Sequence, residues 1–231
     1  FEGDIFEEVV RASDVFGPPG SVVVRSNLVR ENALRFDTDL IVGTDWDFLT
    51  RVSKLTKFGY VDEKTYLYRI HDQNVTVVTS NKSNLQRRFQ SLARVRSKAI
   101  KDDRFRSCSL ETRTAVFYDL LVELLAGEPD RQNEVINWPE FNDLPESERA
   151  RLLRLMASKA ITSGNRYRHI SSWLELSRTL NPSDRKGAIL GGLYSLNPGL
   201  CERLLRVKTS RQKKVEFSSP FTGSIESISS E

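Results

Sequence analysis

The chain has 231 residues, of which 39% are hydrophobic and 29% charged, so it is long enough for one good-sized globular domain or two small ones. No apolar run approaches the length of a transmembrane helix, and no signal peptide is visible. The two cysteines lie far apart in the sequence, so a disulfide framework is unlikely and a reducing compartment such as the cytoplasm is the simpler expectation. With only two histidines, an all-histidine metal site is excluded. The first residue is Phe1 rather than Met, so we expect a chain that starts inside a longer protein, has been processed or is incompletely recorded.

The net charge of +4 is unevenly distributed. Residues 1–80 carry nine Lys or Arg against thirteen Asp or Glu, whereas residues 81–107 carry nine against two. The composition changes near residue 80, and we predict a domain boundary there. A polar, serine-rich segment over residues 208–231 has few large apolar side chains and is predicted to be a disordered tail.

Residues 1–80 have the pattern of a mixed α/β fold. A short helical pattern covers residues 4–12 and is broken by the GPPG sequence at residues 17–20. The SVVV run at residues 21–24 predicts a buried strand. A helix is expected to begin at or just before Asp45 and to stop at Gly59, and a second strand is expected over residues 60–70.

From residue 81 the hydrophobic period is helical, so residues 81–207 are predicted to form an all-α domain of hairpin-like helices. Ser109 suits the N-cap of one of these helices, and the Asn-Pro pairs at residues 181–182 and 197–198 suit helix breaks. The expected helices cover residues 84–101, 109–127, 145–164 and 167–180, a stretch from residue 183 and a short stretch after residue 198.

Segments that suggest chemistry lie in a specific order within the first 80 residues. Residues 20–25 read GSVVVR, residues 36–40 read FDTDL, and residues 43–52 read GTDWDFLTRV. They are followed by YVDE at residues 60–63 and YRIH at residues 68–71. This order resembles the C-terminal, acceptor-side half of the large family of inverting GT-A glycosyltransferases, which extend polysaccharides and decorate glycans. The resemblance covers about a third of the chain and implies a partial Rossmann-like half-domain.

The resemblance also implies roles for particular residues. Asp45 takes the position of the family's general base, which removes a proton from the acceptor hydroxyl as that hydroxyl attacks the anomeric carbon. His71 takes the position that reaches the metal or the diphosphate, and Arg69 lies on the same face of the expected strand. Trp46 would form an apolar wall for a sugar ring. Because the family's usual glutamate before the base is Thr44 here, Asp47 is a rival for the role of base.

The same family uses a nucleotide-sugar donor, a divalent cation (Mn or Mg) and a glycan or lipid-linked acceptor. The cation is held by an Asp-x-Asp motif that this sequence lacks, since the DTD at residues 37–39 matches the acceptor-side turn instead. We therefore expect the motif upstream of Phe1, and no activity from these residues alone. The donor sugar, its nucleotide, the acceptor and the oligomeric state are not determined by the sequence.

Simpler interpretations stand beside each of these. Asp45 has the position of an ordinary helix cap, His71 that of a strand-end histidine, and Trp46 that of a core residue. The basic stretch at residues 81–107 fits a solvated or packed helix face, which we favour, or contact with an anionic membrane. Nothing in the sequence indicates nucleic-acid binding. The alternative to an enzyme is a non-catalytic helical interaction or membrane-surface module with a relic α/β segment.

Overall fold

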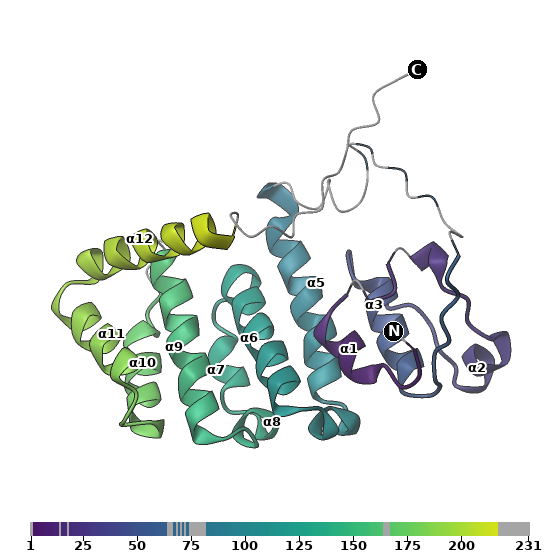
Figure 1. Ribbon diagram of the computed structural model, residues 1–231, viewed down its shortest axis with the longest axis horizontal. Coiled ribbons are helices and arrows are strands. Elements are labelled where there is room, and N and C mark those ends of the chain that lie inside the picture. The colour runs from purple at the N-terminus through teal and green to yellow at the C-terminus, as the bar shows by residue number, and fades with distance from the viewer. Residues whose placement is uncertain are drawn as a thin grey trace. The chain divides into compact units, whose positions relative to one another are not determined.

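The structure is a computed structural model that describes residues 2–13, 15–17, 19–63, 67, 69, 71, 73, 82–163 and 167–216. The chain forms two compact units, Phe1–Met156 and Ala157–Glu231. The expected boundary near residue 80 falls within the first unit. There α3 (Thr44–Ser53) packs against α5 (Lys82–Ile100), and α5 lies alongside α6 (Leu110–Gly127), as Figure 1 shows.

The first unit is built from helices joined by irregular segments. A helix lies within the predicted residues 4–12, over Phe6–Arg11, and the helix over Asp45 is also present, although it ends at Ser53, well before Gly59. The elements of this unit are α1 (Phe6–Arg11), η1 (Pro19–Ser21), α2 (Ser26–Glu31), α3 (Thr44–Ser53), α5 (Lys82–Ile100), η2 (Asp103–Ser107), α6 (Leu110–Gly127), α7 (Gln132–Val135), α8 (Pro139–Asn142) and the start of α9 (Glu146–Thr162).

The predicted α/β half-domain is wrong for the described residues, which contain helices and no strand. The SVVV run begins at Ser21, the last residue of a 3-10 helix, and continues as irregular chain. Val22 and Val24 pack against a core cluster while Val23 is 97% exposed, so the side chains alternate as in a strand. No described segment pairs with this backbone, and a strand requires a neighbour to satisfy its N–H and C=O groups.

The second expected strand, over residues 60–70, is also absent in the residues that the structure describes there. Residues 60–63 are irregular, and Tyr60 and Val61 are exposed. Most of residues 64–70 lie outside the described residues. The β pairing in the described part is a single antiparallel bridge between Gly3 and Phe58, in which each residue's N–H donates to the other's carbonyl at 2.7 and 2.8 Å.

Two neighbouring clusters of buried side chains fix α1 and α3 in the first unit. The first cluster joins Val9 of α1, Trp46 of α3 and Val95 of α5. The second surrounds Phe48 and Val52 on the other side of α3. Because an apolar helix face must be covered, the helical spacing of these residues predicts burial but not the partner.

A third packed region lies around α6. Ser109 caps this helix as predicted, its Oγ accepting from the N–H of Thr112 at 3.2 Å. Phe117 stacks edge-on against Phe105 and against Phe141, with centroids 6.0 and 5.3 Å apart. All three rings are almost completely buried.

The second unit begins within α9 and continues with α10 (Ile170–Leu180), α11 (Arg185–Leu196) and α12 (Pro198–Glu216). The two Asn-Pro pairs separate these helices as expected, α10 packs on α11, and α11 packs on α12. The sequence predicted a short last helix and a disordered tail from residue 208, whereas α12 continues to Glu216. Residues 217–231 of the expected tail lie outside the described residues.

Candidate functional site

The first turn of α3 carries three of the residues singled out from the sequence. Gly43 precedes the helix with φ of 75°, a left-handed conformation that glycine adopts without strain. Its carbonyl accepts from the N–H of Asp47 at 2.9 Å, which begins the helical hydrogen bonding. The turn therefore presents Asp45, Trp46 and Asp47 in three different directions around the axis.

Asp45 is partly exposed and has little to hold it. Its Oδ1 accepts from the N–H of Trp46 at 2.9 Å. No cation in the described part of the chain forms an ion pair with this carboxylate. One oxygen is thus fixed at the helix N-terminus, where an anion is favoured, and the other is left for a further partner.

Asp47 is in the opposite situation, since its side chain is only 3% exposed. One carboxylate oxygen accepts from Nη2 and Nε of Arg51 at 2.8 and 3.2 Å. The other accepts from Nζ of Lys98 on α5 at 2.9 Å. A buried carboxylate with two cationic partners is a structural anion, because removing its charge would leave Arg51 without a carboxylate partner and Lys98 with Asp37 alone among the described residues.

A pocket of about 400 Å³ opens beside Asp47, between α3 and α5. Lys98 bridges Asp47 and Asp37, reaching Oδ2 of Asp37 at 2.5 Å. This bond, with the N–H of Asp39 and the charge of Arg94, lowers the pKa of Asp37 below its usual value. The residues that line the pocket are Arg35, Asp37, Asp47, Thr50, Arg51, Lys54, Val95, Lys98, Ala99 and Asp102.

The charges in this pocket largely satisfy one another. Lys54 forms an ion pair with Asp102, and Lys98 and Arg51 both form ion pairs with Asp47. Arg35 is the lining cation without a carboxylate partner among the described residues, and it donates to the carbonyl of Leu34 instead. The ion pairs that line this pocket therefore connect α3 to α5. Asp45 is not among the lining residues.

Trp46 occupies the core in this structure, as the simpler interpretation proposed. Its side chain is 3% exposed, and its Nε1 donates to the carbonyl of Val9 at 2.6 Å. The guanidinium of Arg96 lies over the ring at 4.8 Å from the centroid. Both faces are occupied by protein, so the ring stabilises the contact between α1, α3 and α5.

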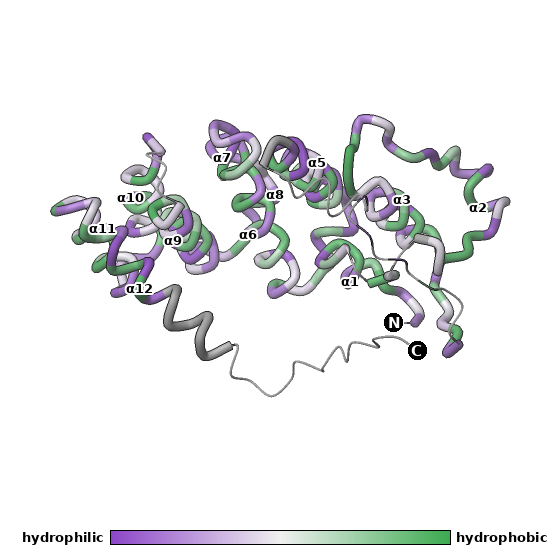
Figure 2. The backbone as a smooth tube through the Cα atoms, turned by 90° about the horizontal axis from the view of Figure 1, so that it is seen from above, coloured by the Kyte–Doolittle hydropathy of each residue, from purple (hydrophilic) through white to green (hydrophobic). Residues whose placement is uncertain are grey.

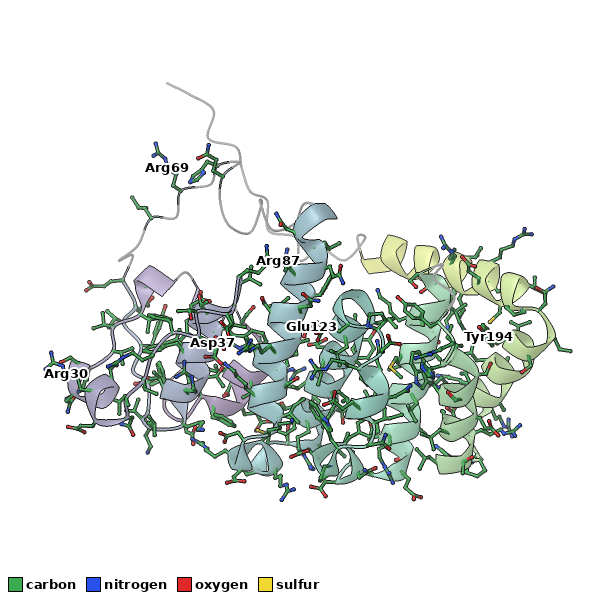
Figure 3. The ribbon with its side chains drawn as sticks, turned by 180° about the vertical axis from the view of Figure 1, so that it is seen from behind. Arg30, Asp37, Arg69, Arg87, Glu123 and Tyr194 are labelled. Carbon is green, nitrogen blue, oxygen red and sulfur yellow. The ribbon has the colours of Figure 1, made fainter. Side chains whose placement is uncertain are left out.

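Arg69 and His71 lie between α3 and α5 in the sequence, in a segment of which the structure describes few residues. Both are described as isolated positions, because residues 68, 70 and 72 lie outside the described residues. Nδ1 of His71 accepts from the N–H of Gln73 at 3.2 Å. Figure 3 shows Arg69 well apart from Asp37, and the roles of both residues stay predictions.

The expected divalent cation finds no complete site in the part of the chain that the structure describes. No three His, Cys, Asp or Glu side chains gather there as metal ligands. A single carboxylate such as Asp45 supplies too few ligands to hold a hard cation by itself. Among the described helices, none is long and apolar enough to cross a bilayer.

The sequence analysis missed one buried ionic group, formed by Arg96 of α5 and Glu123 of α6. Glu123 is 7% exposed, and burial raises its pKa to about 7, opposed by Arg96 and supported by Asp119. Its Oε1 accepts from Nε of Arg96 at 2.9 Å, while its Oε2 is buried without a hydrogen-bond partner. Figure 3 labels its position. The sequence signal was a glutamate within the apolar stripe at residues 116–125.

No family model, curated protein or solved structure matches this chain.

Proposed function

We propose that the chain is the acceptor-side part of an inverting glycosyltransferase of polysaccharide biosynthesis, with Asp45 as the general base. The observation that carries this proposal is the contrast between the two aspartates of α3. Asp47 is buried and paired with two cations, whereas Asp45 is accessible and has no cationic partner in the described residues. The pattern that resembles the inverting glycosyltransferases therefore has one aspartate available for proton transfer.

The proposed step is a single displacement at the anomeric carbon. An acceptor hydroxyl attacks this carbon, its proton passes to the accessible oxygen of Asp45, and the bond to the leaving diphosphate breaks on the opposite side. A base needs to lie within hydrogen-bond reach of the proton that it removes. The bond from the N–H of Trp46 orients the carboxylate for this task without neutralising it.

The remaining parts of the reaction belong to the same proposal. Arg69 and His71 would face the diphosphate and the divalent cation, which would stabilise the leaving group. In the resemblance, the DTD at residues 37–39 matches the acceptor-side turn and not the cation-binding Asp-x-Asp motif, so a longer polypeptide would supply the nucleotide-sugar site. A glycan or lipid-linked acceptor and a location in the cytoplasm or at the inner face of a membrane complete it.

The test is sugar transfer by the full-length protein with manganese and a panel of nucleotide-sugars. Asp45→Asn is expected to lower turnover by roughly a hundredfold or more, because general-base catalysis contributes about that much. Nucleotide binding, measured by calorimetry, should be unchanged. Asp47→Asn is the matched control, since it removes the same charge from the same helix turn. It should lower the free energy of unfolding, whereas the turnover of the folded protein should stay close to that of the wild type.

Two results would contradict the proposal: full activity of the Asp45→Asn protein, or no transfer from any nucleotide-sugar. The second candidate function is a non-catalytic helical interaction module. It is supported by the observation that the described residues form helices and no sheet. This module would give no turnover in any variant, and Asp45→Asn would leave partner binding unchanged.

A further inference from the structure

The last helix of the second unit has an exposed apolar stripe beside its packed face. Cys201 is completely buried on the side where α12 meets α11. Leu200, Leu204 and Val207 are 46%, 51% and 52% exposed, and their spacing of four and three residues places them on one side of the helix. Large apolar side chains left in water at this spacing indicate a surface that another phase or molecule covers.

The charge of α12 is strongly positive. Its sequence contains six Lys or Arg and two Glu between residues 198 and 216. Arg203 and Lys208 border the apolar stripe, and neither has a carboxylate partner among the described residues. Arg206 pairs with Glu202 at 2.7 Å. Figure 2 shows both hydrophilic and hydrophobic residues along this helix.

The basic stretch at residues 81–107 differs from α12 in this respect. Several of its cations are engaged in ion pairs within the first unit: Arg94 with Asp37 and Asp39, Arg96 with Asp119 and Glu123, Lys98 with Asp37 and Asp47, Arg104 with Asp4, and Arg106 with Asp143. Their charges are therefore largely satisfied by the protein. The cations beside the α12 stripe remain available to an external anion.

The apolar stripe and the positive charge of α12 together indicate which kind of partner covers this surface. A second copy of this helix would bring two sets of like charges together, which opposes association. A phosphate-rich surface alone would leave the apolar stripe in water. A bilayer with anionic headgroups satisfies both features, since its headgroups attract the cations and its acyl boundary takes up the apolar side chains.

We propose that α12 is an interfacial helix that binds flat to an anionic lipid surface through Leu200, Leu204 and Val207, with Arg203 and Lys208 at the headgroups. This proposal does not depend on Asp45 or on sugar transfer. If both hold, α12 brings the enzyme to the surface where lipid-linked acceptors reside.

The first experiment reports the environment of the stripe in the full chain. Leu204→Cys is labelled with an environment-sensitive fluorophore, and the two native cysteines are protected because both are buried. Phosphatidylcholine vesicles that contain phosphatidylglycerol should shift the emission to the blue, and vesicles of phosphatidylcholine alone should not. The same label at Leu110→Cys, an exposed leucine at the start of α6, is expected to show no shift.

The second experiment measures binding to the anionic vesicles by sedimentation. Arg203→Glu with Lys208→Glu should weaken binding at least roughly tenfold, since each cation near an anionic surface contributes about 1 kcal/mol. Leu204→Gln with Val207→Gln should also weaken binding, and it leaves the net charge unchanged. The charge control is Arg25→Glu with Arg30→Glu, which changes the net charge equally at the N-cap and within α2 and should retain binding.

Three outcomes would overturn the proposal. One is no response of the Leu204 label to anionic vesicles while circular dichroism shows the chain folded. Another is equal binding by the α12 and α2 charge variants, because binding would then follow net charge alone. The third is a label shift that depends on protein concentration without lipid, which would show that a second copy covers the stripe.

Discussion

Lys98 of α5 donates to the buried carboxylate of Asp47 of α3 across 2.9 Å, although the two residues are far apart in the sequence. The same ammonium group reaches Asp37 in the segment that precedes α3. This one cation therefore connects the helix that carries the proposed base with the loop before it and with α5. It also decides that Asp47, and not Asp45, is the structural aspartate.

The first prediction compares the two aspartates by stability. Asp47→Asn should lower the free energy of unfolding by about 2 kcal/mol, because it removes a buried charge from two cations that are themselves partly exposed. Asp45→Asn should change it by less than about 0.5 kcal/mol, the usual range for a partly exposed site outside such a network. Urea titrations followed by circular dichroism measure both, and equal losses would contradict the assignment.

Glu123 predicts an unusual pH dependence. Burial raises its pKa from 4.5 to about 7, so between these values the folded protein binds the proton more tightly than the unfolded chain does. The contribution to stability is fully present below pH 4.5 and is lost as the pH rises through 7. Linkage gives a loss of up to about 3 kcal/mol over this window.

The control for this window is Glu123→Gln, which keeps an acceptor for Arg96 but cannot titrate. Its free energy of unfolding should vary less between pH 5 and 8 than that of the wild type, by about the amount above. Urea titrations across this range measure the difference. Parallel pH profiles of the two proteins would show that the carboxylate does not titrate in this range.

Gly127 marks a close approach between α6 and α5. A Cβ atom at this position would lie 3.0 Å from the backbone nitrogen of Gln90 and 3.2 Å from the backbone carbon of Phe89. Because backbone atoms cannot yield as a flexible side chain can, Gly127→Ala should destabilise the protein by about 1–3 kcal/mol. Gly192→Ala in α11 meets nothing within 4 Å and should be neutral or stabilising by up to about 1 kcal/mol. Thermal unfolding separates the two, and a neutral Gly127→Ala would refute the close approach.

The left-handed conformation of Gly43 leads us to expect a definite order of stability among substitutions at this position. With φ of 75°, glycine is favoured, asparagine is tolerated and alanine is strained, by about 1–2 kcal/mol. Gly43→Asn should therefore be more stable than Gly43→Ala, and both less stable than the wild type, in the same urea titration. If the proposed function is right, the order of turnover should follow, because this residue positions Asp45.

The helices were predictable because their signals are local. The Ser109 cap, the two Asn-Pro breaks and the apolar stripe of α6 each act within a few residues of the backbone that they govern. The strands were not. The SVVV run has the side-chain alternation of a strand, but a strand forms only when another segment pairs with it, and no described segment does so.

At the candidate site, too, the local features were predictable from the sequence and the long-range contacts were not. The sequence alone placed Asp45, Trp46 and Asp47 in the first turn of one helix, since helix spacing and the preceding glycine suffice for that. Only the tertiary structure decided that Trp46 is buried against Val9, that Asp47 is paired with Lys98 and that Asp45 is left accessible. Ion pairs and burial depend on which distant helix faces meet, and local backbone preferences do not carry that information.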